Sequence, residues 1–199
     1  MGYIKGLKKD CCPDCKPAIC DPCSDWTLDG HCGPTEYPTD PASFPAGVIA
    51  SGNHVEASGL NCTTTNDCAE GGGSLTGCDW LLDISKIYGP FSEDMDVSID
   101  GTASVFRGNA VANACGFGPP GSARVVVSAT NLTSYSGDFV LQVNSGTGQS
   151  ASDTIAITGI LPAGLTMLIT LTLDDAQRGS DACGTTDAEI DVSVTPSAP

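Results

Sequence analysis

Between residues 95 and 196, apolar side chains alternate with polar ones along short runs of the chain. In "MDVSID" (95–100), Val97 and Ile99 point one way while Asp96, Ser98 and Asp100 point the other. This period of two is typical of a β-strand with one face buried. The pattern recurs in six further runs: TASVFRG (102–108), SARVVVSAT (122–130), GDFVLQVNS (137–145), SDTIAITGI (152–160), LTMLITLTL (165–173) and AEIDVSVTP (188–196). The pattern therefore predicts an all-β body.

The breaks between these runs carry residues that favour turns. They are Gly101-Thr102, Gly118-Pro119-Pro120-Gly121, Asn144-Ser145-Gly146, Pro162-Ala163-Gly164 and Asp174-Asp175. About seven short strands in roughly 110 residues fit an immunoglobulin-like (Ig-like) antiparallel β-sandwich, and a jelly roll of about eight strands is the alternative. We expect this sandwich to occupy residues 88–196.

Part of this region resembles a known kind of module. VVVSATNLTSYSGDFVLQVNSG contains a turn at Asn131, and DTIAITGILPAGLTMLITLTL contains the turn Leu161-Pro162-Ala163-Gly164. In these features the chain resembles the CARDB-like and related Ig-like modules of bacterial and phage surface proteins. The resemblance implies a β-sandwich used as a spacer or adhesive module, with no catalytic residues to carry over.

Residues 1–70 have a different character, with eight cysteines and, before residue 46, seven prolines. Pro34, Pro38, Pro41 and Pro45 each remove a backbone donor and restrict φ, which excludes a helix or a central strand there. We expect an extended arm with little regular structure, ordered by crosslinks, metal or contact with other molecules. Residues 71–87 are predicted to form a glycine-rich hinge and a short apolar segment, either helical or a first strand.

The eleven cysteines are an odd number, so they cannot all pair within one chain. The disulfide candidates are Cys62 with Cys68, Cys115 with Cys183, and Cys11 and Cys78 with partners left open. Such crosslinks typically contribute about 2–4 kcal/mol each. The alternative is zinc, which two C-x-x-C pairs and a later His-Cys pair could bind: Cys12, Cys15, Cys20, Cys23, His31 and Cys32. Only four residues separate the two C-x-x-C pairs, which favours disulfides.

The formal net charge of −16 disfavours nucleic-acid binding and docking on anionic membranes. No apolar run approaches the roughly 18 residues of a membrane span, and no apolar signal region follows the lysines of MGYIKGLKKD. The acids Glu93, Asp94, Asp96 and Asp100 raise the question of calcium. Strand alternation already accounts for Asp96 and Asp100, so calcium is not expected.

No catalytic residues are predicted, because the chain has only His31 and His54 and lacks the G-x-S-x-G and phosphate-loop motifs. We therefore expect a non-enzymatic structural subunit, most concretely a phage virion accessory protein (capsid decoration, cement or fibre component). Its arm would bind other protein subunits, including copies of itself, in a virion or extracellular assembly. The alternatives are a secreted or cell-surface Ig-like adhesion module and an intracellular zinc-binding adaptor.

Overall fold

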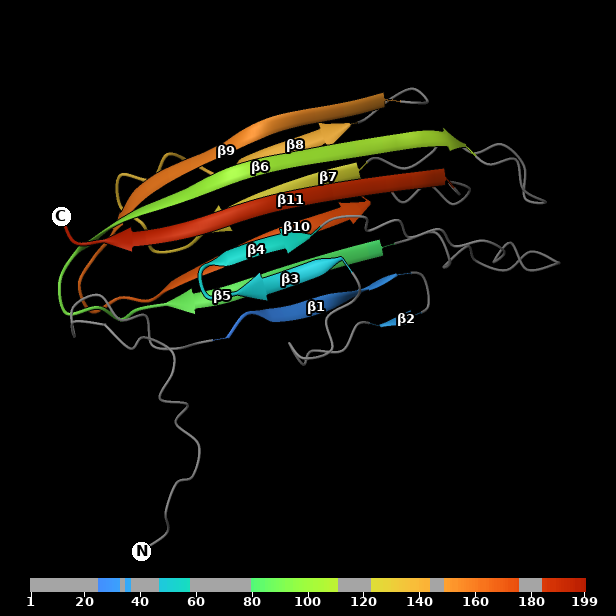
Figure 1. The fold of residues 1–199 in the computed structure, drawn as a ribbon. Coiled ribbons are helices and arrows are strands. Elements are labelled where there is room, and N and C mark those ends of the chain that lie inside the picture. The colour runs from blue at the N-terminus through green and yellow to red at the C-terminus, as the bar shows by residue number, and fades with distance from the viewer. Residues whose placement is uncertain are drawn as a thin grey trace, which may run out of the picture.

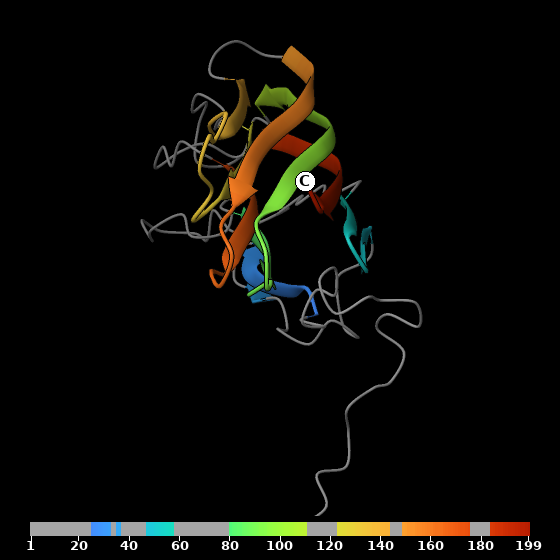
Figure 2. The ribbon, with the colours of Figure 1, turned by 90° about the vertical axis from the view of Figure 1, so that its left-hand side faces the viewer.

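The computed structural model describes residues 25–32, 35–36, 47–57, 80–110, 123–143, 149–175 and 184–199. In these ranges the chain forms eleven β-strands and no helix, so none of them contains a helix that could cross a membrane. The strands lie in two antiparallel sheets packed face to face (Figures 1 and 2). The predicted all-β sandwich is therefore confirmed.

Each sheet combines strands that are distant in the sequence. The six-stranded sheet has the order β2 (Thr35–Glu36), β1 (Thr27–Cys32), β5 (Trp80–Tyr88), β10 (Met167–Asp175), β7 (Ala123–Ala129), β8 (Phe139–Val143). The five-stranded sheet has the order β3 (Val48–Ser51), β4 (His54–Ala57), β11 (Gly184–Ser197), β6 (Met95–Ala110), β9 (Gln149–Leu161). The long strands β6, β9 and β11 run side by side along the five-stranded sheet (Figure 1).

The core lies between the sheets and contains the side chains that the alternation predicts. Residues from five strands have at most 2% of their surface exposed: Val97, Ile99, Val125, Val127, Ile155, Ile157, Met167, Ile169, Leu171, Leu173, Ile190, Val192 and Val194. Burying a side chain of this size stabilises the fold by about 1.5–3 kcal/mol. Phe139 and Leu141 are only partly buried because β8 is an edge strand. Leu165 is 45% exposed and precedes β10.

Two predicted turns are absent, and a third is present. Gly101 continues β6, because it pairs with Val192 on one side and Ile155 on the other. Asp174 and Asp175 end β10 as strand residues. The predicted turn at Pro162 does form: Leu165 N donates to Pro162 O at 3.1 Å, and Gly164 has φ = 77°. A positive φ at this position is what a type II turn requires.

The prediction that residues 1–70 lack regular structure is wrong for the ranges that the structure describes. β1 pairs with β5, and β4 pairs with β11. Trp26, Leu28, Val48, Val55 and Ala57 are buried in the shared core. These strands are short and lie between proline- and cysteine-rich runs, which concealed their alternation. Of the predicted hinge and apolar segment, residues 80–87 belong to strand β5, and residues 71–79 lie outside the described ranges.

A buried lysine joins the first strands to the rest of the sandwich. Lys86 points inward from β5, is 5% exposed, and donates to Gly52 O at 2.7 Å and Asn53 Oδ1 at 3.4 Å. Its Nζ lies 5.6 Å from the ring centroid of Trp26 and 4.8 Å from that of Tyr88. Trp26 Nε1 also donates to Gly52 O, at 2.9 Å. A cation over aromatic rings is stabilised further when it is shielded from water. These contacts connect β1, the β3–β4 turn and β5.

Candidate functional site

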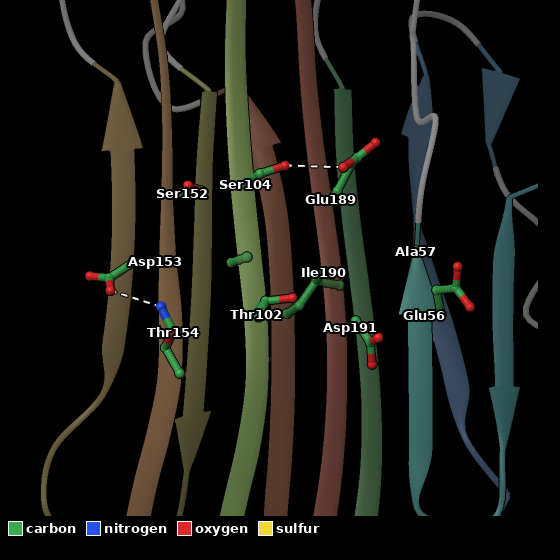
Figure 3. A pocket seen from close by; sticks show the side chains of 11 residues that line it. Glu56, Ala57, Thr102, Ser104, Ser152, Asp153, Thr154, Glu189, Ile190 and Asp191 are labelled. Carbon is green, nitrogen blue, oxygen red and sulfur yellow. Dashed lines mark hydrogen bonds between the residues drawn. The ribbon is translucent and has the colours of Figure 1, made fainter.

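The outward face of the five-stranded sheet carries a polar surface with a shallow groove. Strand register aligns Glu56 on β4, Asp191 on β11, Thr102 on β6 and Thr154 on β9 in one row. The neighbouring row contains Glu189, Ser104 and Ser152. These residues form what we call the acidic face, and Asp153 of the edge strand β9 adjoins it (Figure 3). Their side chains, with Ala57, Ala103 and Ile190, line a shallow groove of about 420 Å³.

Several acidic side chains on this surface have hydrogen-bond partners. Ser104 Oγ donates to Glu189 Oε2 at 3.1 Å. His54 Nε2 lies 2.9 Å from Asp191 Oδ1, with side chains 42% and 61% exposed. Solvent screening makes exposed pairs of this kind weak. His54, which the sequence analysis considered only as a catalytic candidate, thus lies in β4 with a carboxylate partner.

A second groove of about 330 Å³ lies at the other end of the same sheet, near residues 130–138. Its polar lining residues are Asp96, Ser98, Ser134, Thr158, Thr195 and Ser197. Thr133 and Ile160 exchange two backbone hydrogen bonds of 2.8 Å, which attach this segment to the edge of β9. The two grooves make the outward face polar at both ends.

Tyr135 holds the same segment in place. Its hydroxyl donates to Asp138 Oδ1 at 2.6 Å and accepts from Ala129 N at 3.1 Å. Burial, and then the bond to Asp138, raises the pKa of Tyr135 to about 12.

On the opposite sheet, Arg124 forms an ion pair with Asp174 through two hydrogen bonds of 3.0 and 2.5 Å. The hydrogen bond to Asp174 raises the pKa of Arg124, so the guanidinium stays charged.

The composition of the two grooves limits their chemistry. Carboxylates and hydroxyls line them, and neither lining contains an aromatic ring, a lysine or an arginine. Such a surface repels anions and attracts positively charged partners. Within the described ranges, no three His, Cys, Asp or Glu side chains come together in a way that could hold a metal ion. Asp96 and Asp100 alternate outward on β6, as the strand pattern predicts, and Asp94 Oδ1 accepts from Ala163 N at 2.8 Å.

Most of the predicted cysteine sites lie outside the described residues. This holds for the disulfide candidates Cys11, Cys62, Cys68, Cys78, Cys115 and Cys183 and for the metal candidates Cys12, Cys15, Cys20 and Cys23. Only the backbones of His31 and Cys32 are described, at the end of β1, where they pair with Leu81 and Trp80 of β5. The disulfide pairings and the zinc alternative therefore stay predictions.

Sequence reasoning missed the acidic face and the buried lysine. Glu56 is far from Glu189 and Asp191 in the sequence, and nothing in the sequence pairs β4 with β11. Lys86 had a usable signal, since strand alternation places it in the inward set with Leu82 and Ile84. The helical alternative for residues 80–87 obscured that signal.

Comparison with known proteins assigns no family. No family model matches the chain, and no curated protein matches it. A structure of an arabinose-bound α-L-arabinofuranosidase, MgGH51, aligns with 76% of this chain at 14% identity and a TM-score of 0.28. The aligned part of this chain spans 23% of that enzyme. A likeness of this size carries no argument about fold or activity.

Proposed function

We propose that this chain is a non-enzymatic structural subunit of a protein assembly, most concretely a phage virion accessory protein such as a capsid decoration, cement or fibre component. The cysteine- and proline-rich N-terminal segment anchors the subunit, and the sandwich is displayed. The observation that carries this proposal is where the sandwich begins, at β1, and where its last strand, β11, ends.

The body begins and ends on the same side. Thr27 pairs with Ser85 near the end of β5, and Ser197 pairs with Asp96 near the start of β6. The short connection 89–94 joins β5 to β6 at that end. An anchor that enters at residue 25 is therefore attached at this end of the described strands. Attachment at one end suits a displayed module.

The composition of the acidic face supports a binding role over a catalytic one. Its side chains are exposed and lie on an open sheet, whereas efficient catalytic groups are held in water-excluding sites. An adhesion module at a cell surface is the second candidate, because the groove of about 420 Å³ could hold a polar ligand. It differs from the first in needing no other copies of the chain.

Intact particles from the native source test the proposal. We expect the chain to sediment with the particles and to be released, on non-reducing electrophoresis, partly as disulfide-linked species. Metal analysis of the same material separates zinc from disulfides. A chain found only as a free monomer, absent from every particle fraction, would refute the structural-subunit proposal.

A further inference from the structure

β9 forms one margin of the five-stranded sheet (Figure 1). It pairs with β6 from Gln149 to Leu161 without a shift in register. Alternate residues therefore direct their backbone N–H and C=O groups away from β6. Thr158 and Ile160 belong to that outward set, because their backbone groups bond to Ser136 and Thr133.

The outward set continues toward the start of β9 with Ala156, Thr154, Ser152 and Ser150. Within the part of the chain that the structure describes, no backbone hydrogen bond is formed on this edge at Ser150, Ser152 or Ala156. At Thr154 the N–H is occupied by the chain itself, since Asp153 Oδ1 accepts it at 2.7 Å (Figure 3). All of these residues are exposed. An open edge of this length is a template for an added strand.

The charges around this edge indicate what kind of strand it fits. Asp153 lies on the edge itself, and the acidic face adjoins it. Of the eight lysines and arginines in the chain, four lie within the first sixteen residues: Lys5, Lys8, Lys9 and Lys16. Residues 1–9 (MGYIKGLKK) contain three lysines, no acid and no proline. The positive charge of this segment complements the negative charge of Asp153 and the acidic face. Because the segment contains no proline, its backbone N–H groups can all pair in a strand.

We propose that the outer edge of β9, at residues 150–156, binds residues 1–9 of a neighbouring copy of this chain as an additional strand. The lysines then lie beside Asp153 and the acidic face. The inference rests on the proposed function, since it requires that copies meet in an assembly, and it names one contact that links them. Binding between copies links one sandwich to the next in an assembly. Binding of residues 1–9 to β9 of the same chain would not link copies.

The test uses the full chain, with ¹⁵N-labelled and unlabelled protein mixed in equal amounts at low ionic strength. A carbodiimide joins lysines to carboxylates that lie in contact. We expect mixed heavy–light crosslinks between Lys5, Lys8 or Lys9 and Asp153, with the yield falling as salt is raised, because salt screens exposed charges. Crosslinks confined to single copies, or joining these lysines only to acids outside Asp153 and the acidic face, would overturn the proposal.

A proline substitution on the edge supplies a matched pair of variants. Ser152→Pro removes an outward N–H and no bond to β6, so we expect the mixed crosslink to be lost while the far-ultraviolet spectrum stays unchanged. Ala50→Pro places a proline on the opposite edge strand of the same sheet, β3, and should retain the crosslink. A chain lacking residues 2–9 provides a second test if Ser152→Pro fails to fold, and it should form no intercopy contact at Asp153.

The outcomes separate this inference from the proposed function. Particles that retain the chain while Lys5, Lys8 and Lys9 never reach β9 would overturn the strand-docking inference and leave the structural-subunit proposal standing. Absence of the chain from every particle fraction would refute the structural-subunit proposal directly.

Discussion

Trp26 offers the sharpest test of the finding that the first strands belong to the core. Its side chain is 3% exposed and donates to Gly52 O at 2.9 Å. Removing a buried tryptophan typically costs about 3–5 kcal/mol, because contacts are lost and a cavity remains. We therefore expect Trp26→Ala to lower the free energy of unfolding by about 3–5 kcal/mol. For a protein of this size, that corresponds to a fall in Tm of about 6–20 °C.

Urea unfolding followed by circular dichroism measures this loss, and two further variants make the result specific. Trp26→Phe keeps much of the packing and removes the hydrogen bond, so it should cost less than Trp26→Ala; a typical hydrogen bond contributes about 0.5–1.5 kcal/mol. Ile49→Ala alters a side chain that is 58% exposed on β3, and it should stay within about 0.5 kcal/mol of wild type. A loss below about 1 kcal/mol for Trp26→Ala would mean that β1 does not share the cooperative core.

Three more substitutions test particular contacts. Gly101→Ala places a Cβ against Asp191 O and should destabilise the β6–β11 pairing by about 1–3 kcal/mol in urea unfolding. Arg124→Gln leaves the mostly buried Asp174 without its cation and should cost about 1–2 kcal/mol, a value reduced for partial exposure, in thermal melts at neutral pH. Because the pKa of Tyr135 rises on folding from 10.0 to about 12, wild-type stability should fall as pH rises through this window. Tyr135→Phe should not show the part of this loss of stability that Tyr135 causes. If the variant lost stability at alkaline pH as the wild type does, the raised pKa of Tyr135 would be contradicted.

The strands of the C-terminal part were predictable because their signal is local. β10 alternates apolar and polar residues from Ile169 to Leu173, β11 does so from Ala188 to Val194, and the inward residues of both runs are buried. The break predicted at Gly101 was wrong because turn propensity could not reveal that β11 and β9 flank that residue. The first strands were missed for a related reason, since four-residue strands such as β3 and β4 hold too few alternations to stand out among prolines.

The candidate site was much less accessible from the sequence than the fold class. The acidic face depends on the pairing of β4 with β11, and the pair His54–Asp191 spans 137 residues of sequence. The cysteines are the main chemical feature of the sequence, and both their connectivity and the zinc alternative stay predictions. A polar residue on a strand looks like any solvent-facing position in the sequence. Only its neighbours on the adjacent strands show that it belongs to a site.

By itself, the sequence determined that this chain forms an acidic, all-β protein with inward and outward residues assigned along most long strands. That information is local, because each strand shows its own alternation of apolar and polar residues. Only the tertiary structure decided which strands share a sheet, that residues 26–28 and 47–57 complete the core, and that β9 lies at one margin of the five-stranded sheet. These features follow from register between distant segments, which is chosen by the packing of the whole core.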